Sequence, residues 1–416
     1  MATTSPQEAP RFLLLLPPAP SPLTTSSLST AYAETITQVL QEVASHASES
    51  PKAAVLEVAL ACPHLVSKTK QPPPRSSLYA ATQKLIAGVY GLVCSVAAKE
   101  GINVEDADGV DVRVLLVAWS GADHDDQVDA GRSPYGAVTT LRSLARSGRA
   151  WRFAFGVETA EGEAMVRAFL AAKGSDGDEV VRVPSGGSGV GREQSTSNST
   201  SLQPSNSSGA NTHHHVAVGG TFDHIHIGHK LLLTMTVFAV DDSPPQQPDH
   251  RSATIGITGD ALLVNKKHRE VLEPWEDRYK AVMTFVNALL DFSPPGSAGQ
   301  RHVSIRDDPG PNGRSMDVSY PSGLVVKCTE IQDAFGPTIT EEGISALVIS
   351  AETRAGGKAV NDKRREKGWA ALEVFEVDVL DAGEEAGAGA VEGFESKLSS
   401  TAIREKLVKK SRQSSL

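Results

Sequence analysis

Cysteine is scarce in this chain of 416 residues: Cys62, Cys94 and Cys328 lie far apart and in no metal-ligand spacing. This pattern excludes a disulfide framework and a structural zinc site, and it favours a reducing compartment. No run of about 18 apolar residues occurs, so we expect no transmembrane helix and no membrane partner. The run from Phe12 to Leu16 is too short for a signal-peptide core and predicts a buried strand. We therefore expect a cytoplasmic protein.

Positive charge is in deficit, because 40 Lys and Arg residues stand against 50 Asp and Glu residues, a formal net charge of −10. An acidic chain is a poor non-specific binder of nucleic acid, so we expect no nucleic-acid partner. Any anionic ligand must then be held by local positive groups. The P-loop pattern is also missing, since Gly356-Gly357-Lys358-Ala359 lacks the hydroxyl and the preceding glycine. This excludes a fused P-loop kinase.

A change of composition divides the chain. Residues 184–212 consist mainly of Ser, Gly, Asn and Gln, and so little apolar surface cannot offset the entropy of ordering. We therefore predict an N-terminal domain over 1–183, a linker over 184–212 and a second domain over 213–416. In both halves strand-like runs alternate with amphipathic helices, which indicates the α/β class. For the second half we predict a mostly parallel, Rossmann-like sheet, with ligands beyond the carboxyl ends of its strands.

The predicted elements follow from apolar periodicity. In the first half they are strands at 11–16, 53–61, 112–119 and 151–156 and helices at 27–46, 76–100 and 135–147. In the second half they are strands at 215–218, 253–258, 302–305, 324–329, 346–350 and 372–379, helices at 228–240, 274–290, 360–367 and 399–410, and loops at 307–322 and 381–393.

The most informative stretch directly follows the strand at 215–218, where it reads Gly219-Gly220-Thr221-Phe222-Asp223 and then His226-Ile227-Gly228-His229. Paired glycines let the backbone approach a ligand closely. His226 and His229 are three residues apart and share one face at a helix start, where free N–H groups and the helix dipole favour phosphate. Gly228 leaves room for a triphosphate. A zinc site is disfavoured, because zinc helices space their histidines four apart around a glutamate.

This stretch resembles the nucleotidyltransferase superfamily defined by the sequence His-x-Gly-His. Together with Leu231-Leu232-Leu233 it looks like eukaryotic, fungal-type phosphopantetheine adenylyltransferase. The resemblance covers roughly residues 214–410, and Asp111–Leu116 is similar to the N-terminal region of the bifunctional animal enzyme. Further similar segments lie at 265–267, 272–278, 333–338, 350–361 and 399–404.

The resemblance implies transfer of AMP from ATP to 4'-phosphopantetheine, giving dephospho-CoA and pyrophosphate in coenzyme A biosynthesis. It also implies association with other enzymes of that pathway. The implied catalytic residues are Thr221, His226, His229 and Lys266. The implied nucleotide-binding residues are Gly219, Gly220, Phe222, Gly228, Ser399, Ser400, Thr401 and Arg404.

The chemistry gives each implied part a role. Lys266 would meet the acceptor phosphate as a point charge, and Thr221 would orient that phosphate. His229 would stabilise the pentavalent α-phosphorus, while His226 would touch the triphosphate or the ribose. The hydroxyls and N–H groups of residues 399–401, at a second helix start, suit the β- and γ-phosphates. We expect Mg²⁺ held mainly by the ATP phosphates, and no metal ligands from the protein.

Several alternatives remain open. The chain could be a cytidylyltransferase or a mononucleotide adenylyltransferase of the same superfamily, or a scaffold with a degenerate catalytic domain. Lys266 could be a solvated lysine, and the sequence does not decide whether Lys266 or Lys267 contacts substrate. Arg404 could lie on the solvated face of a basic helix. Arg354 falls one position before the Arg of the animal enzyme, which puts that phosphate contact in doubt.

Overall fold

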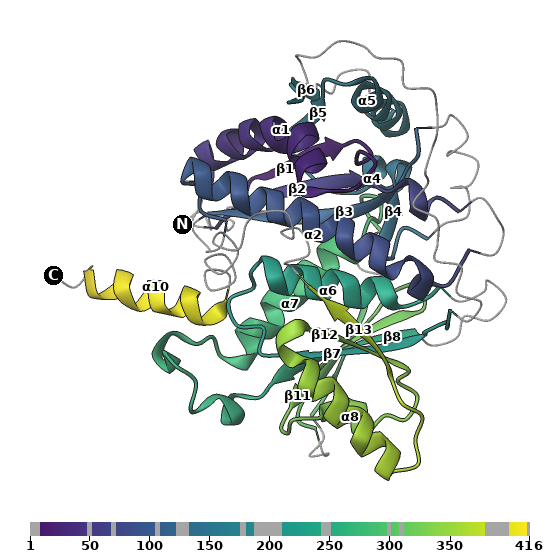
Figure 1. Cartoon of the computed structure of the whole chain (residues 1–416), viewed down its shortest axis with the longest axis vertical. Coiled ribbons are helices and arrows are strands. Elements are labelled where there is room, and N and C mark those ends of the chain that lie inside the picture. Colours follow the sequence, from purple (N-terminus) through teal and green to yellow (C-terminus); the bar gives the residue numbers. More distant parts are fainter. Residues whose placement is uncertain are drawn as a thin grey trace.

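The computed structural model describes residues 9–47, 52–67, 72–104, 109–121, 133–174, 180–186, 210–242, 251–297, 301–307, 312–378 and 399–413. Most of the predicted linker and the loop expected at 381–393 lie outside the described residues. The described residues form two α/β units in contact, each built on its own sheet (Figure 1). The predicted α/β class is therefore confirmed.

The N-terminal unit is a sheet of six parallel strands in the order β4-β3-β2-β1-β5-β6. The strands are β1 (Arg11–Leu16), β2 (Ala54–Ala61), β3 (Val110–Ala118), β4 (Val138–Thr140), β5 (Phe153–Val157) and β6 (Val180–Val183). The helices are α1 (Thr25–Ser45), α2 (Arg75–Glu100), α4 (Leu141–Arg146) and α5 (Ala160–Lys173). Strand β2 is buried along its whole length. Its nearly all-apolar sequence is typical of a parallel strand covered on both faces.

The C-terminal unit is a seven-stranded sheet in the order β13-β12-β7-β8-β11-β10-β9. Its strands are β7 (His215–Gly220), β8 (Arg251–Thr258), β9 (His302–Arg306), β10 (Ser315–Ser319), β11 (Leu324–Ile331), β12 (Ala346–Ser350) and β13 (Glu373–Val377). Its helices are α6 (Ile227–Ala239), α7 (Trp275–Leu290), α8 (Arg354–Glu366) and α10 (Ser400–Gln413). The sheet is mostly parallel, as predicted, and only β9 and β10 run antiparallel to their neighbours.

The strand order places a switch point at β7. After β7 and β8 the chain runs to the edge strand β9, comes back through β10 to β11 beside β8, and then crosses to β12 on the other side of β7. In open parallel sheets a ligand crevice forms where the strand order reverses, beyond the carboxyl ends of the strands. The carboxyl end of β7 is Gly219-Gly220, so the topology and the His-x-Gly-His stretch point to the same edge.

Some sequence-based boundaries are wrong. The helix predicted over 135–147 is instead strand β4 followed by the short helix α4. The β-branched residues Val138, Thr139 and Thr140 form the strand, and the Thr140 hydroxyl then accepts the N–H of Ser143 at 3.0 Å and starts the helix. The prediction also missed α5 and β6. Helix α5 begins after Thr159, whose hydroxyl accepts the N–H of Gly162 at 3.0 Å.

Two further corrections lie in the C-terminal unit. The loop predicted over 307–322 contains β10, which pairs with both β9 and β11. Helix α8 starts at Arg354, six residues before the predicted start at 360. The helix tolerates the pair Gly356-Gly357 because it packs closely on the sheet: a Cβ at Gly357 would lie only 3.3 Å from Cδ1 of Ile349.

The two units share one hydrophobic core. Helices α2 and α6 lie side by side between the two sheets (Figure 1). One continuous cluster of buried apolar side chains includes residues of both sheets. Tyr79 of α2 stacks on Phe375 of β13, with ring centroids 4.5 Å apart. By length and composition alone α2 could cross a membrane, but 67% of its most apolar window is buried inside the protein. The sequence of α2 is apolar because the helix packs against both units.

The shared core predicts that the halves stay together when the chain is cut between them. We expect a specific protease site inserted between Ser195 and Thr196 to yield two fragments that co-elute in size exclusion under native conditions. The fragments should separate only in denaturant, as checked by gel electrophoresis of each column fraction. Separate elution of the two native fragments would show that the contact between the units is weak.

Candidate active site

The N-terminus of α6 is open. Its N-cap residue, His226, has extended backbone angles, and no described side chain caps the first N–H groups of the helix. Such free N–H groups and the positive end of the helix dipole make an anion site. Gly219, at the end of β7, faces open space, and a Cβ at Gly228 would lie 3.1 Å from the His226 ring. Gly228 therefore lets the His226 ring lie close to the helix backbone.

His226 and His229 stack on each other beside this helix start. Their ring centroids are 3.9 Å apart with an interplanar angle of 30°. Nδ1 of each ring is buried and has no hydrogen-bond partner among the residues that the structure describes. Burial, together with a smaller effect of the nearby His224, lowers the pKa of His229 to about 4. Burial also lowers the pKa of His226, with additional contributions from His229 and Lys230. Both rings are therefore uncharged at neutral pH, and each carries one N–H donor.

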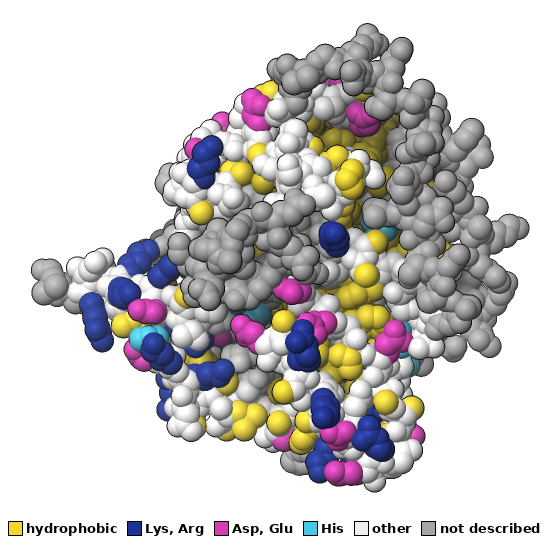
Figure 2. Space-filling model, viewed as in Figure 1, with side chains coloured by type: hydrophobic (Ala, Val, Ile, Leu, Met, Phe, Trp, Pro, Cys, Tyr) yellow, Lys and Arg dark blue, Asp and Glu magenta, His cyan; other side chains and the backbone are white. Residues whose placement is uncertain are grey.

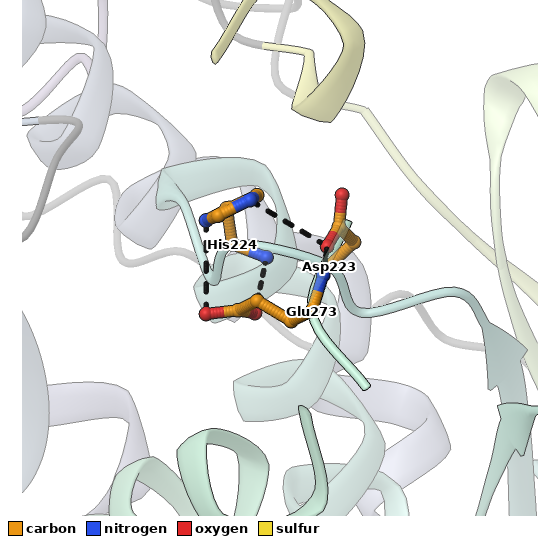
Figure 3. Close-up of side chains that lie close together, drawn as sticks. All are labelled: Asp223, His224 and Glu273. Carbon is orange, nitrogen blue, oxygen red and sulfur yellow. Dashed lines mark hydrogen bonds and ion pairs between the residues drawn. The ribbon is translucent and has the colours of Figure 1, made fainter. Parts of the chain in front are cut away.

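The loop between β7 and α6 has an unusual backbone. Phe222 and His224 have φ angles of 52° and 47°, a region that residues other than glycine rarely occupy. Figure 3 shows the side chains that hold this turn. Asp223 is fully buried, and its Oδ1 accepts the N–H of Glu273 at 2.9 Å. In return the carboxylate of Glu273 accepts the N–H of His224 at 2.8 Å. These reciprocal bonds fix the turn.

Asp223, His224 and Glu273 lie close enough to suggest a metal site (Figure 3). Their hydrogen bonds argue against it. Oδ2 of Asp223 accepts from Arg404, and Nε2 of His224 lies 2.8 Å from the carbonyl of Val271, to which it must donate. The protonated Nε2 therefore cannot bind a metal, and Nδ1, the other ring nitrogen, lies 3.6 Å from Oε1 of Glu273. The cluster therefore braces the loop.

Arg404 ties α10 to this loop. It is 2% exposed, so the solvated position that the sequence left open for it is wrong. Its guanidinium donates to the carboxylate of Asp223, to the carbonyl of Lys267 at 3.0 Å and to the hydroxyl of Thr401 at 3.2 Å. Beyond the first turn, α10 carries Lys and Arg side chains that gather on the projecting helix (Figure 2).

A pocket of about 640 Å³ opens at this edge of the sheet and extends beneath α8. Nearly all of the residues predicted from the sequence line it: Gly219, Gly220, Thr221, His226, Gly228, His229, Lys266, Ser399, Ser400, Thr401 and Arg404. Phe222 does not, because it is fully buried and its ring packs against His229 at 5.3 Å between centroids. Lys266 belongs to the lining, whereas the neighbouring Lys267 contributes its carbonyl to Arg404.

The start of α10 closes one side of the pocket. The Ser400 hydroxyl donates to the carbonyl of Asp223 at 2.9 Å and lies 3.4 Å from Nε2 of His226. The Ser399 hydroxyl accepts the N–H of Ala402 at 3.2 Å. Two helix N-termini, those of α6 and α10, thus meet around the histidine pair. An anion bound there would face N–H groups from both.

Other residues of the resembling segments have structural contacts. Arg278 is fully buried and donates to the carbonyl of Thr221 at 2.7 Å, which helps to hold the loop. Asn361 bonds the backbone of Leu372 through both amide atoms. Arg354 is exposed and pairs with Glu376.

Sequence reasoning missed Thr254 on β8. Thr254 lines the pocket, and its buried hydroxyl has no hydrogen-bond partner within the described part of the chain. The alternation of Thr254, Gly256 and Thr258 along the strand places all three on the pocket face. This period of two was visible in the sequence, although nothing there indicated that the space opposite the strand is open.

Comparison with known proteins finds one family match and several relatives. Residues 1–188 match a family described as a domain of unknown function, DUF8446. A phosphopantetheine adenylyltransferase of Saccharomyces cerevisiae is 35% identical over 47% of this chain and 49% of its own length. An uncharacterized protein of Schizosaccharomyces pombe is 34% identical over 46% of this chain and 48% of its own length.

An archaeal phosphopantetheine adenylyltransferase, from Methanopyrus kandleri, is 27% identical over 40% of this chain and 80% of its own length. The chain spans only about half the length of the two yeast relatives that it matches.

The lowered histidine pKa values predict how stability depends on pH. His229 titrates near 6.5 in the unfolded chain and near 4 in the folded protein, so between these values the unfolded chain binds more protons. The free energy of unfolding should therefore fall as pH drops from 6.5 to 4. His229→Asn should reduce this slope by about one proton, or about 1.4 kcal/mol per pH unit.

Urea denaturation at a series of pH values between 4 and 7 measures this slope. His302→Asn, on the exposed strand β9, is the matched control and should leave the slope unchanged. An unchanged slope in His229→Asn would contradict a neutral, desolvated imidazole.

Proposed function

We propose that this chain is a pantetheine-phosphate adenylyltransferase, which transfers AMP from ATP to 4'-phosphopantetheine. One observation carries the proposal: two uncharged, stacked imidazoles with free ring nitrogens lie where two helix N-termini and Lys266 meet around one pocket. That arrangement suits a polyphosphate whose α-phosphorus is attacked by a second anion. The names of the relatives favour phosphopantetheine as the acceptor.

In this reaction an oxygen of the acceptor phosphate attacks the α-phosphorus of ATP. A new phosphorus–oxygen bond forms, the bond from the α-phosphorus to the oxygen bridging to the β-phosphate breaks, and pyrophosphate leaves with that electron pair. The attacking phosphate is already an anion, so the protein needs no general base. Its contribution is to hold the two anions in line and to stabilise the charge that grows on the α-phosphate.

The lining residues divide this task by their chemistry. A ring N–H of His229 would donate to the α-phosphate in the transition state, and His226 would contact the triphosphate or the ribose. Neutral rings donate without a proton-transfer step, which fits the low pKa of both. Lys266 would offset the charge of the acceptor phosphate, with Thr221 orienting it. The start of α10, residues 399–401, would hold the β- and γ-phosphates.

Magnesium would reach this pocket bound to ATP. Its described lining residues carry three carboxylates, those of Asp333, Glu352 and Asp378, and that of Asp333 already accepts the N–H groups of Phe335 and Gly336 at 2.7 and 2.6 Å. The carboxylates of Asp223 and Glu273, outside this lining, accept the hydrogen bonds that hold the loop between β7 and α6. This donor set fits an ion held mainly by the triphosphate, where it would add positive charge beside the β- and γ-phosphates.

A panel of nucleotides and acceptors separates this proposal from its relatives within the superfamily. We expect pyrophosphate release with ATP and 4'-phosphopantetheine to exceed that of any other pair by at least about 100-fold in kcat/KM. The other pairs would combine ATP or CTP with choline phosphate, ethanolamine phosphate or nicotinamide mononucleotide. Preference for CTP, or for a mononucleotide acceptor, would replace the proposal with a cytidylyltransferase or a mononucleotide adenylyltransferase. Release with no pair would favour a scaffold.

In this proposal His229 is the histidine that donates to the α-phosphate. We expect His229→Ala to lower kcat by about 10²–10³, because the variant loses a donor that acts in the transition state. The KM for ATP should change much less, and circular dichroism should show an intact fold. His302→Ala on exposed β9 controls for the loss of any histidine. Turnover near that of the wild type at saturating ATP would remove His229 from the reaction.

A further inference from the structure

A chain of buried charges connects the two units. Lys230 of α6, 4% exposed, donates through Nζ to Oδ1 of Asp111 at 2.6 Å and to the carbonyl of Val112 at 3.1 Å. The other carboxylate oxygen of Asp111 accepts from Nε of Arg113 at 2.9 Å. Burial alone would raise the pKa of Asp111, but the charges of Lys230 and Arg113 outweigh it and lower that pKa. Asp111 is therefore ionised at neutral pH.

The charges continue across the N-terminal sheet. Arg113 of β3 is the strand partner of Glu57 of β2, which is fully buried. Arg149 donates to Glu57 at 2.9 Å and also to the carbonyl of Asp291, just beyond α7, at 3.0 Å. Lys230 and Arg149 are thus the two ends of this charge chain, and it attaches to both α6 and α7 of the C-terminal unit.

Ionic groups are a costly way to join two apolar faces. Each buried charge loses its hydration, and well-packed apolar residues of similar size often stabilise as much or more. What an ion pair with hydrogen bonds adds is a fixed direction and distance. The pair of Lys230 and Asp111 therefore defines where the start of α6 lies relative to the N-terminal sheet.

Lys230 is the residue directly after His229. Successive side chains on a helix point about 100° apart, so Lys230 reaches into the N-terminal unit while His229 faces the pocket. The N–H of Lys230 also donates to the carbonyl of His226 at 2.9 Å and closes the first turn of α6. A side chain locked at Lys230 thus restrains both histidines.

We propose that the N-terminal unit positions the active-site helix, with Asp111 as the positioning residue that fixes Lys230 and through it His226 and His229. The proposal rests on the proposed function for its kinetic consequence, but the placement of the histidines can be measured without any reaction. It gives the N-terminal unit, which belongs to the stretch matched as a domain of unknown function, a role as a platform for the pocket.

The test compares Asp111→Asn with Arg75→Gln. Both variants remove a charge from the same interface between the units. Arg75 pairs with Asp242 at 3.1 Å, beyond the C-terminal end of α6 and far along the helix from the histidines. We expect Asp111→Asn to lower kcat about 10–100-fold with KM for both substrates changed less than about threefold, because the donor is displaced while ground-state contacts remain. Arg75→Gln should leave kcat within about twofold of the wild type.

Two further variants keep the test decisive. Asp111→Glu retains the carboxylate and should recover most of the lost kcat. If Asp111→Asn fails to fold because Lys230 is left unpaired, the neutral pair Asp111→Asn with Lys230→Gln removes that buried charge and should fold, still with a lowered kcat. A wild-type kcat in the folded Asn variant or in the folded neutral pair would overturn the proposal.

Imidazole resonances of the free protein separate this proposal from the reaction itself. With ¹⁵N-labelled histidine, the signals of His226 and His229 should move in Asp111→Asn and stay in place in Arg75→Gln. If the signals move as expected but the wild type transfers no AMP, the proposed function is wrong and the positioning role of Asp111 is supported. If the wild type transfers AMP but neither the signals nor kcat change in Asp111→Asn, the positioning role of Asp111 is wrong and the proposed function is supported.

Discussion

The carboxylate of Asp223 lies fully out of solvent, and three segments of the chain meet on it. It accepts the backbone N–H of Glu273, just before α7, and the guanidinium of Arg404 from α10, while it belongs itself to the loop between β7 and α6. A buried charge is tolerated only where such partners satisfy it, so these three segments cannot move independently. The strained turn through Phe222 and His224 persists because the surrounding bonds determine it.

The consequence is a pocket wall assembled from distant parts of the sequence. The same brace that sets the turn brings the start of α10 within 3.4 Å of the His226 ring and turns Phe222 inward against His229. Desolvation then keeps both imidazoles neutral. From the other side the N-terminal unit holds the same helix through Lys230. The site is thus restrained from two directions, by a loop brace and by a neighbouring sheet.

Much of this site could be predicted from the sequence because its signals are local. Helical spacing places His226 and His229 on one face, and the order of parallel strands brings the loop with Lys266 to the same edge as Gly219. The features that could not be predicted depend on contacts between residues far apart in the sequence. The inward turn of Phe222 depends on its brace, and Asp111 contacts Lys230 across 119 positions, which no spacing rule indicates. Strand β10 was hidden because Gly, Pro and Asp around it suggested a loop.

The central claim is that a neutral imidazole pair at the start of α6 receives the nucleotide phosphates. The most direct test is ¹⁵N NMR of labelled histidine in the wild-type protein at pH 7, before and after addition of ATP with magnesium. We expect His226 and His229 to be neutral in the free protein, and a ring N–H signal of each to shift to that of a stronger hydrogen bond when ATP binds. Charged imidazoles in the free protein, or signals that ATP at saturation does not move, would contradict this claim.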